Sequence, residues 1–141
     1  MKKLTKAEEQ IMQILWRLKR AFVKEIIAEF PEPEDQKPKY TTVATVLKVL
    51  ETKGFVAHEK FGNSNRYAPT VTEEYYSEFA VKDVMGKYFD GSLSKLVSFF
   101  VKKDKVDINE LDDIMGLIEE KQQKQDNNPP NNKNKDNNSN K

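Results

Sequence analysis

With 141 residues, 37% of them hydrophobic and 33% charged, the chain can form one compact domain or two small ones around a modest core. It has no cysteine, which excludes disulfides, thiolate metal sites and cysteine nucleophiles. It also lacks an apolar run of the roughly 18–20 residues that a membrane span needs, so we expect the protein in the cytoplasm. The net charge is +1, but residues 1–70 carry 13 Lys/Arg against 9 Asp/Glu whereas residues 71–125 carry 8 against 12, which suggests that the front half faces a polyanion.

Three helices are predicted before residue 54. Thr5 and Glu8 form a capping box at the start of the first helix. The second helix runs over Val23–Phe30 and ends before a proline, which disfavours helix in the preceding residue. The third helix, Thr41–Lys53, is rich in β-branched residues, yet its apolar residues recur at helical spacing and Gly54 provides a C-cap.

A β-hairpin is predicted next. The segments Phe55–Phe61 and Arg66–Val71 have the composition of strands, and the sequence Gly-Asn-Ser-Asn at 62–65 is typical of a turn between them. Three helices followed by a hairpin, within about 70 residues, is the order of a winged helix-turn-helix domain.

The second half is predicted to be helical. Thr72 caps one helix, the apolar spacing over Leu93–Val101 indicates another, and Asp107 caps a last one. From Gln122 the chain is dominated by Asn, Lys, Gln and Pro, so we expect disorder there. The predicted fold class is mainly α with a small β-hairpin. It divides into a winged helix-turn-helix domain at 1–71, a C-terminal three-helix dimerisation module at 72–121 and a tail at 122–141.

The residues offer no catalytic or metal-binding constellation. His58 is the only histidine, so we interpret it as a strand residue and not as a base or a metal ligand. The adjacent acids Asp112-Asp113 and Glu119-Glu120 point to different sides of a helix, and we interpret them as solvated. The chain is therefore predicted not to be an enzyme and to have no catalytic residues, no metal and no cofactor.

The third helix and the hairpin carry the residues that favour DNA binding. If the apolar stripe of this helix faces the core, hydroxyls, an alanine and a lysine face outward, and such small side chains let a helix enter a major groove. Basic side chains flank the hairpin tip, where they would contact phosphates or the minor groove. The predicted DNA-binding residues are Thr41, Thr42, Ala44, Thr45, Lys48, Lys60, Asn63, Asn65 and Arg66.

The C-terminal helices carry more apolar surface than three short helices can bury. Residues 72–124 hold seven of the fourteen aromatic residues, and such an excess favours pairing with a second copy. The alternative is that these aromatic residues pack back on the winged helix. The predicted dimer-interface residues are Tyr76, Phe79, Leu93, Leu96, Val97, Phe100, Leu111, Ile114, Met115 and Ile118.

Across these segments the chain resembles the penicillinase repressors of the BlaI/MecI type. The motifs that carry the resemblance are Leu4–Glu8, Ile14–Trp16, Thr42–Leu47, Lys53–Val56, Arg66-Tyr67 and Gly91–Leu93. The resemblance implies a dimeric winged-helix repressor that binds double-stranded DNA at a dyad-symmetric operator. It also implies a membrane-bound sensor metalloprotease as partner, whose activation leads to cleavage of the repressor in its C-terminal module.

The sequence departs from this family at several positions. Phe99-Phe100 stands where the family has the Asn-Phe bond that is cleaved, so this pair is the candidate proteolysis site. Val49 stands where better-studied members have an arginine in the recognition helix, and Ala44 departs as well. The C-terminal cysteines of copper-responsive relatives are absent, which argues against copper sensing.

Two other functions remain open from the residues alone. The winged helix could be a protein-interaction module, which would need no basic wing, and Lys60 and Arg66 favour DNA over that interpretation. The chain could also be a regulator that binds a small ligand between its aromatic C-terminal helices.

Overall fold

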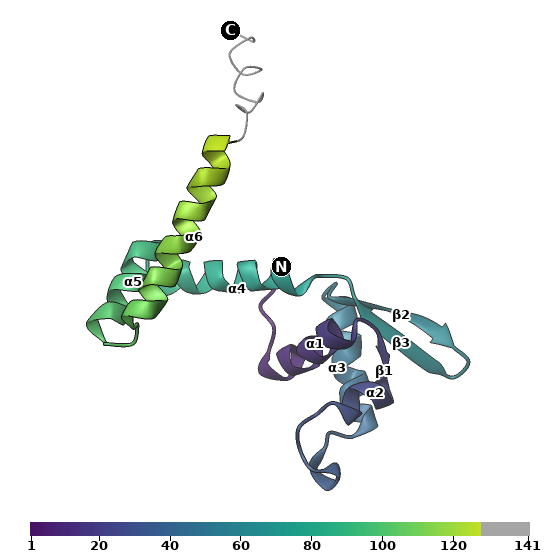
Figure 1. Ribbon diagram of the computed structural model, residues 1–141. Coiled ribbons are helices and arrows are strands. Elements are labelled where there is room, and N and C mark those ends of the chain that lie inside the picture. The colour runs from purple at the N-terminus through teal and green to yellow at the C-terminus, as the bar shows by residue number, and fades with distance from the viewer. Residues whose placement is uncertain (128–141) are drawn as a thin grey trace. The chain divides into compact units, whose positions relative to one another are not determined.

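The structure is a computed structural model that describes residues 1–127. These form two compact units, residues 1–91 and residues 92 onward. The elements are, in chain order, α1 (Lys6–Leu18), β1 (Ala21–Phe22), α2 (Val23–Ala28), the short 3-10 helix η1 (Glu34–Gln36), α3 (Tyr40–Thr52), β2 (Val56–Phe61), β3 (Ser64–Pro69), α4 (Glu73–Tyr88), α5 (Leu93–Lys102) and α6 (Ile108–Asn127) (Figure 1).

The first unit confirms the predicted fold class and adds a third strand. The sheet is antiparallel with the order β1-β3-β2, and the β2–β3 hairpin extends away from helices α1, α2 and α3 (Figure 1). The third strand, β1, consists of only two residues, Ala21 and Phe22, which pair with Tyr67 and Arg66. So short a strand between two helices has no periodicity of its own, and only its pairing with a distant segment defines it.

The ends of the helices follow the sequence signals closely. The Thr5 hydroxyl accepts a hydrogen bond from the Glu8 amide at 3.2 Å, and the Glu8 carboxylate accepts one from the Thr5 amide at 2.8 Å, which completes the predicted capping box. At the end of α3, Gly54 has φ +85° and the Phe55 amide donates to the Leu50 carbonyl at 2.9 Å. This is the Schellman arrangement, in which a glycine adopts the left-handed conformation at little cost.

One core holds the three helices and the sheet of the first unit together. Leu47 and Leu50 are completely buried and fix the inner face of α3. Trp16 of α1 donates its indole N–H to the Val71 carbonyl at 2.8 Å and so ties α1 to the segment that follows the sheet. The buried side chains of this core are those of Leu4, Ile11, Met12, Ile14, Leu15, Ala21, Val23, Ile26, Phe30, Val43, Leu47, Leu50, Phe55, Val56, Tyr67 and Tyr76.

Helix α4 contributes Tyr76 and Phe79 to that same core. Tyr76 is only 5% exposed, its hydroxyl accepts a hydrogen bond from the Leu4 amide at 2.8 Å, and its ring lies 5.7 Å from that of Phe55. Phe79 is half-buried against it. Both residues are predicted above to lie in a dimer interface, but Tyr76 has almost no surface left for a partner, because it packs on the winged helix of its own chain. The compact units divide after Gly91, and a functional boundary after residue 71 stays a prediction.

The second unit has well-capped helices but no buried side chain among residues 92–126. The Asp107 carboxylate accepts from the Glu110 amide at 2.7 Å, as the capping signal there predicts. The Ser92 hydroxyl also accepts from the Lys95 amide, at 3.1 Å, and caps α5. Helix α6 continues to Asn127, past residue 122 where the disordered tail is predicted to begin. The remainder of the predicted tail lies outside the described residues.

Candidate nucleic-acid interface

Helix α3 presents a polar outer face. Thr41, Thr42, Thr45 and Lys48 are exposed, and Ala44 is half-buried, while Val43, Leu47 and Leu50 anchor the opposite face in the core. The pattern is the one that helical periodicity predicts, because residues three and four apart share a face. The outer face therefore combines short side chains with one positive charge.

The hydroxyl of Thr45 makes a hydrogen bond within α3. It donates to the Thr41 carbonyl at 2.8 Å, so its oxygen is left as an acceptor. In this arrangement Thr45 suits an amino group on a base edge, or the methyl of a thymine, better than it suits a phosphate. Val49, which is exposed on the same helix, adds apolar surface of the kind that contacts thymine methyls.

The register of the hairpin divides the predicted wing residues between its two faces. Lys60 pairs with Asn65 and His58 with Tyr67, so these side chains share the face that carries buried Tyr67. Arg66 pairs with Glu59 and lies on the opposite face, while Asn63 sits in the turn after Gly62. Lys60 and Asn65 therefore share one face of the wing, and Arg66 does not.

Arg66 is engaged inside the hairpin. Its guanidinium lies 3.3 Å from a Glu59 carboxylate oxygen and 4.6 Å from the centre of the Phe61 ring, over which it stacks. Lys48 and Lys60, by contrast, are exposed and form no ion pair with a described carboxylate. The two lysines thus offer their full charge to a polyanion, whereas the charge of Arg66 is partly neutralised.

A hydrogen bond that the sequence did not predict connects the wing to the end of α3. Nδ1 of His58 lies 2.7 Å from a carboxylate oxygen of Glu51. The sequence predicts only an ordinary strand residue at His58, and neither residue type nor spacing indicates this partner. The contact holds the first strand of the wing against the C-terminal half of α3.

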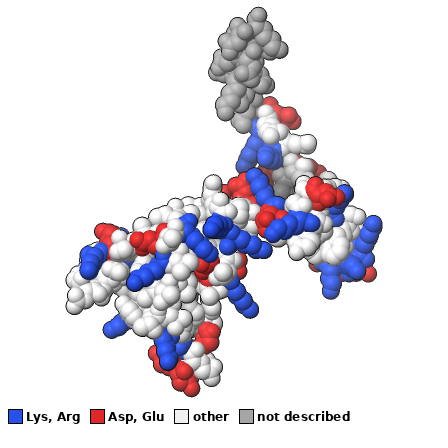
Figure 2. All heavy atoms as spheres, turned by 180° about the vertical axis from the view of Figure 1, so that it is seen from behind, with Lys and Arg blue, Asp and Glu red and all other residues white. Residues whose placement is uncertain are grey.

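Charge alone does not define the interface. On the face shown in Figure 2, lysine, arginine and acidic side chains are interspersed over the surface. The candidate binding surface, which we call the reading face, consists of the outer face of α3 with Lys48 and the wing face with Lys60.

Most of the predicted pairing residues lie on the second unit. Leu93, Phe100, Ile114, Met115 and Ile118 are exposed. Leu96, Val97 and Leu111 are half-buried. The candidate proteolysis site, Phe99-Phe100, lies in α5, with the two rings 5.5 Å apart. Unlike Tyr76, these residues keep apolar surface available.

Residues 1–127 contain neither a membrane-spanning helix nor a cluster of metal-binding side chains. No helix within residues 1–127 is long and apolar enough to cross a membrane. Nor does that part of the chain gather three histidine, aspartate or glutamate side chains where they could hold a metal ion.

Three helices, a small antiparallel sheet and a hairpin beside an exposed third helix define a winged-helix domain. The family model described as "Penicillinase repressor" matches residues 4–120. The chain belongs to the penicillinase repressor family, and it is a DNA-binding transcriptional repressor and not an enzyme.

Individual relatives are similar over most of their length. The penicillinase repressor of Bacillus licheniformis is 27% identical over 83% of this chain and 90% of its own length. The methicillin resistance regulatory protein MecI of Staphylococcus aureus is 28% identical over 84% of this chain and 94% of its own length. The solution structure of the DNA-binding domain of the repressor BlaI matches 54% of this chain and 94% of its own, with 29% identity and a TM-score of 0.44.

Proposed function

We propose that the protein represses transcription as a cytoplasmic homodimer that binds a dyad-symmetric operator. Each copy inserts α3 into a major groove and places its wing on the neighbouring backbone, and the second unit of each chain supplies the pairing surface. The observation that carries this proposal is the exposed face of α3, where small polar side chains surround an unpaired lysine beside the wing.

The pairing part of the proposal is supported by the exposure of the second unit. No side chain among residues 92–126 is buried, although α5 and α6 carry many large apolar residues. Apolar surface of this extent is costly in water and favours a second copy as partner. Two linked copies would bind two half-sites with the added affinity of an intramolecular second contact.

Lys48→Glu is expected to weaken DNA binding about tenfold or more and to reduce the slope of log affinity against log salt by at least about one, because it removes a phosphate contact. Fluorescence anisotropy with a duplex selected from a random pool, repeated at several salt concentrations, measures both quantities. Lys82→Glu, an equal charge reversal at an exposed position of α4, serves as the control and should bind normally. Equal affinity of the Lys48→Glu variant and the wild type would place the DNA elsewhere, and wild-type protein that selects no sequence would refute operator binding.

Release from the operator is proposed to follow disruption of the second unit, with a membrane-bound sensor metalloprotease as the candidate agent. A cut at Phe99-Phe100 would divide α5 and detach α6 from the DNA-binding unit. Loss of pairing would then remove the affinity gained from two linked half-sites. Immunoblots during induction in cells are expected to show a shortened N-terminal fragment, and only full-length protein under full induction would contradict release by cleavage.

A further inference from the structure

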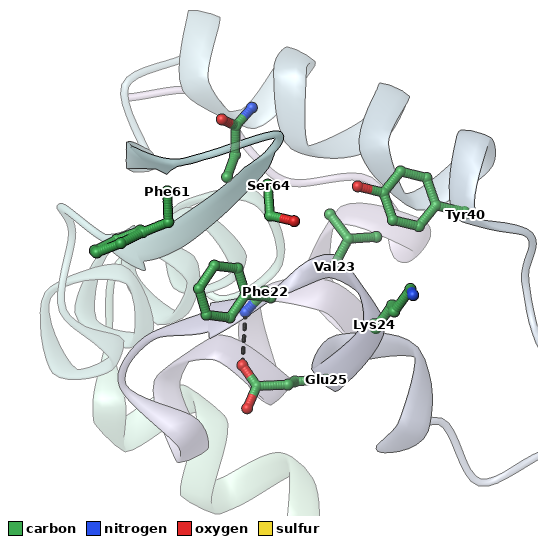
Figure 3. Close-up of a pocket in the computed structure, with 8 residues that line it drawn as sticks. Phe22, Val23, Lys24, Glu25, Tyr40, Phe61 and Ser64 are labelled. Carbon is green, nitrogen blue, oxygen red and sulfur yellow. Dashed lines mark hydrogen bonds between the residues drawn. The ribbon is translucent and has the colours of Figure 1, made fainter.

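An open hollow lies between the tip of the wing, the start of α2 and the start of α3. Its volume is about 400 Å³, and its walls include Phe22, Lys24, Glu25, Tyr40, Phe61 and Ser64 (Figure 3). Tyr40 is the first residue of α3, and Phe61 and Ser64 are the pair of residues that flank the turn of the wing. The hollow thus joins the two elements that are proposed to enter neighbouring grooves of DNA.

The chemistry of the hollow is divided between an aromatic wall and polar groups. The rings of Phe22 and Phe61 meet edge to face with their centres 5.8 Å apart, and Phe61 is exposed. In Figure 3 the Tyr40 hydroxyl points across the hollow toward Ser64, whose own hydroxyl lies on the facing side. The hollow therefore combines two hydroxyl groups, those of Tyr40 and Ser64, with the exposed aromatic ring of Phe61.

The hollow is lined by one lysine, Lys24, and one acidic residue, Glu25. Glu25 accepts a hydrogen bond from the Phe22 amide at 2.8 Å, which commits one of its oxygens to the start of α2. Lys24 lines the same hollow, and the Arg66 guanidinium stacks on Phe61. A ligand that enters this hollow meets two hydroxyl donors and Lys24, against Glu25, one of whose oxygens is already engaged. Arg66, behind the aromatic wall, is itself paired with Glu59.

We propose that this hollow receives one sugar–phosphate segment of the DNA backbone, with Tyr40 and Ser64 donating to a phosphate and Phe61 packing on a deoxyribose. This inference rests on the proposed operator binding and adds residues to it. A backbone strand that separates a major groove holding α3 from a minor groove beside the wing must pass between those two elements. Deoxyribose supplies C–H surface for the aromatic wall, and the phosphate supplies acceptors for the two hydroxyls and for Lys24.

The test uses the full chain and two duplexes, one selected by the wild type from a random pool and one with the same bases scrambled. The double variant Tyr40→Phe/Ser64→Ala removes only two exposed hydroxyls. It is expected to lower affinity about tenfold for both duplexes alike, because backbone contacts carry no base information. Lys24→Gln is expected to lower the salt slope by about one. The control Tyr75→Phe/Ser77→Ala makes the same chemical changes at exposed positions of α4 and should leave binding unchanged.

A scan of single methylphosphonates through the selected duplex locates the phosphate itself. In each half-site, one neutral substitution should weaken the wild type and should not weaken the Tyr40→Phe/Ser64→Ala variant further. Unchanged binding by that variant, alongside impaired Lys48→Glu, would overturn the inference while leaving operator binding intact. A loss confined to the selected duplex would indicate a base contact and would also overturn it. Failure of the wild type to bind either duplex would instead refute the proposed function.

Discussion

The double variant Phe100→Asp/Ile118→Asp is expected to be monomeric and to bind its selected duplex about 10²–10⁴-fold more weakly than the wild type. Both side chains are exposed in the single chain, Phe100 by 39% and Ile118 by 49%, and they lie on α5 and α6. Buried at an interface between two copies, each aspartate would be a charge without a partner, which is strongly unfavourable. The loss of affinity follows because a monomer binds one half-site without the benefit of a linked second one.

Light scattering after size-exclusion chromatography measures the oligomeric state, and anisotropy measures DNA affinity. The control Ser98→Asp/Gln123→Asp adds the same two charges at exposed polar positions of α5 and α6, and it should stay dimeric. The thermal transition of the first unit should be retained in both variants, because its core lies in residues 4–76. A dimeric Phe100→Asp/Ile118→Asp protein would show that pairing uses another surface.

The ion pair between Lys53 and buried Glu8 is expected to make a large contribution to the stability of the fold. Nζ of Lys53 lies 2.8 Å from both carboxylate oxygens of Glu8, and Glu8 is only 4% exposed. The contact joins the first turn of α1 to the residue that follows α3, so it sets the C-terminal end of α3 against α1. Lys53→Met is expected to destabilise the protein by about 3 kcal/mol, the lower end of the range for a buried charge that loses its partner, because Lys53 itself is partly exposed.

Urea unfolding at neutral pH measures this loss. The double variant Glu8→Gln/Lys53→Met should recover most of the stability, because it leaves no uncompensated charge in the core. Lys82→Met, which breaks an exposed pair with Glu78 on α4, should change stability by less than about 1 kcal/mol. A Lys53→Met protein as stable as the wild type would mean that the pair contributes nothing to the fold.

The same pair predicts how stability depends on pH. Burial raises the pKa of Glu8, but the hydrogen bonds from Lys53 and Thr5 and the charge of Lys53 outweigh it and hold the pKa below the ordinary value of 4.5. A carboxyl whose pKa is depressed by folding stabilises the protein above its unfolded pKa, and that contribution disappears as pH falls through the folded pKa. The difference in unfolding free energy between wild type and Glu8→Gln should therefore be constant above about pH 5 and shrink as the pH is lowered below 4.5.

Local signals in the sequence predicted most of the elements correctly. Capping residues, apolar periodicity and one glycine located the helices, because the interactions that start or end a helix lie within four residues of each other. The outer face of α3 follows from the same periodicity, and Thr41, Thr45 and Lys48 lie on it as predicted. These features depend on neighbours in the chain, which a sequence displays directly.

Contacts between distant segments could not be predicted in this way. The partner of Glu8 is 45 residues away, so its role in a capping box was visible and its ion pair with Lys53 was not. The same holds for Tyr76, whose apolar character is compatible with a dimer interface or with the core of its own chain. Its hydrogen bond to Leu4, across 72 residues, decides for the core.

In the wing, the sequence predicts which residues lie near the tip, and the tertiary structure decides which face of the hairpin each one occupies. The sequence by itself determined that a hairpin follows the third helix and that Lys60, Asn63, Asn65 and Arg66 lie near its tip. Only the tertiary structure decided that Lys60 and Asn65 share one face while Arg66 stacks on Phe61 and pairs with Glu59 on the other. The physical reason is the register of the strands. Side chains alternate between the two faces of a strand, so a shift of one residue would move Lys60 to the face that Arg66 now occupies. The pairing of β3 with the distant strand β1 and the packing of Tyr67 in the core fix that register.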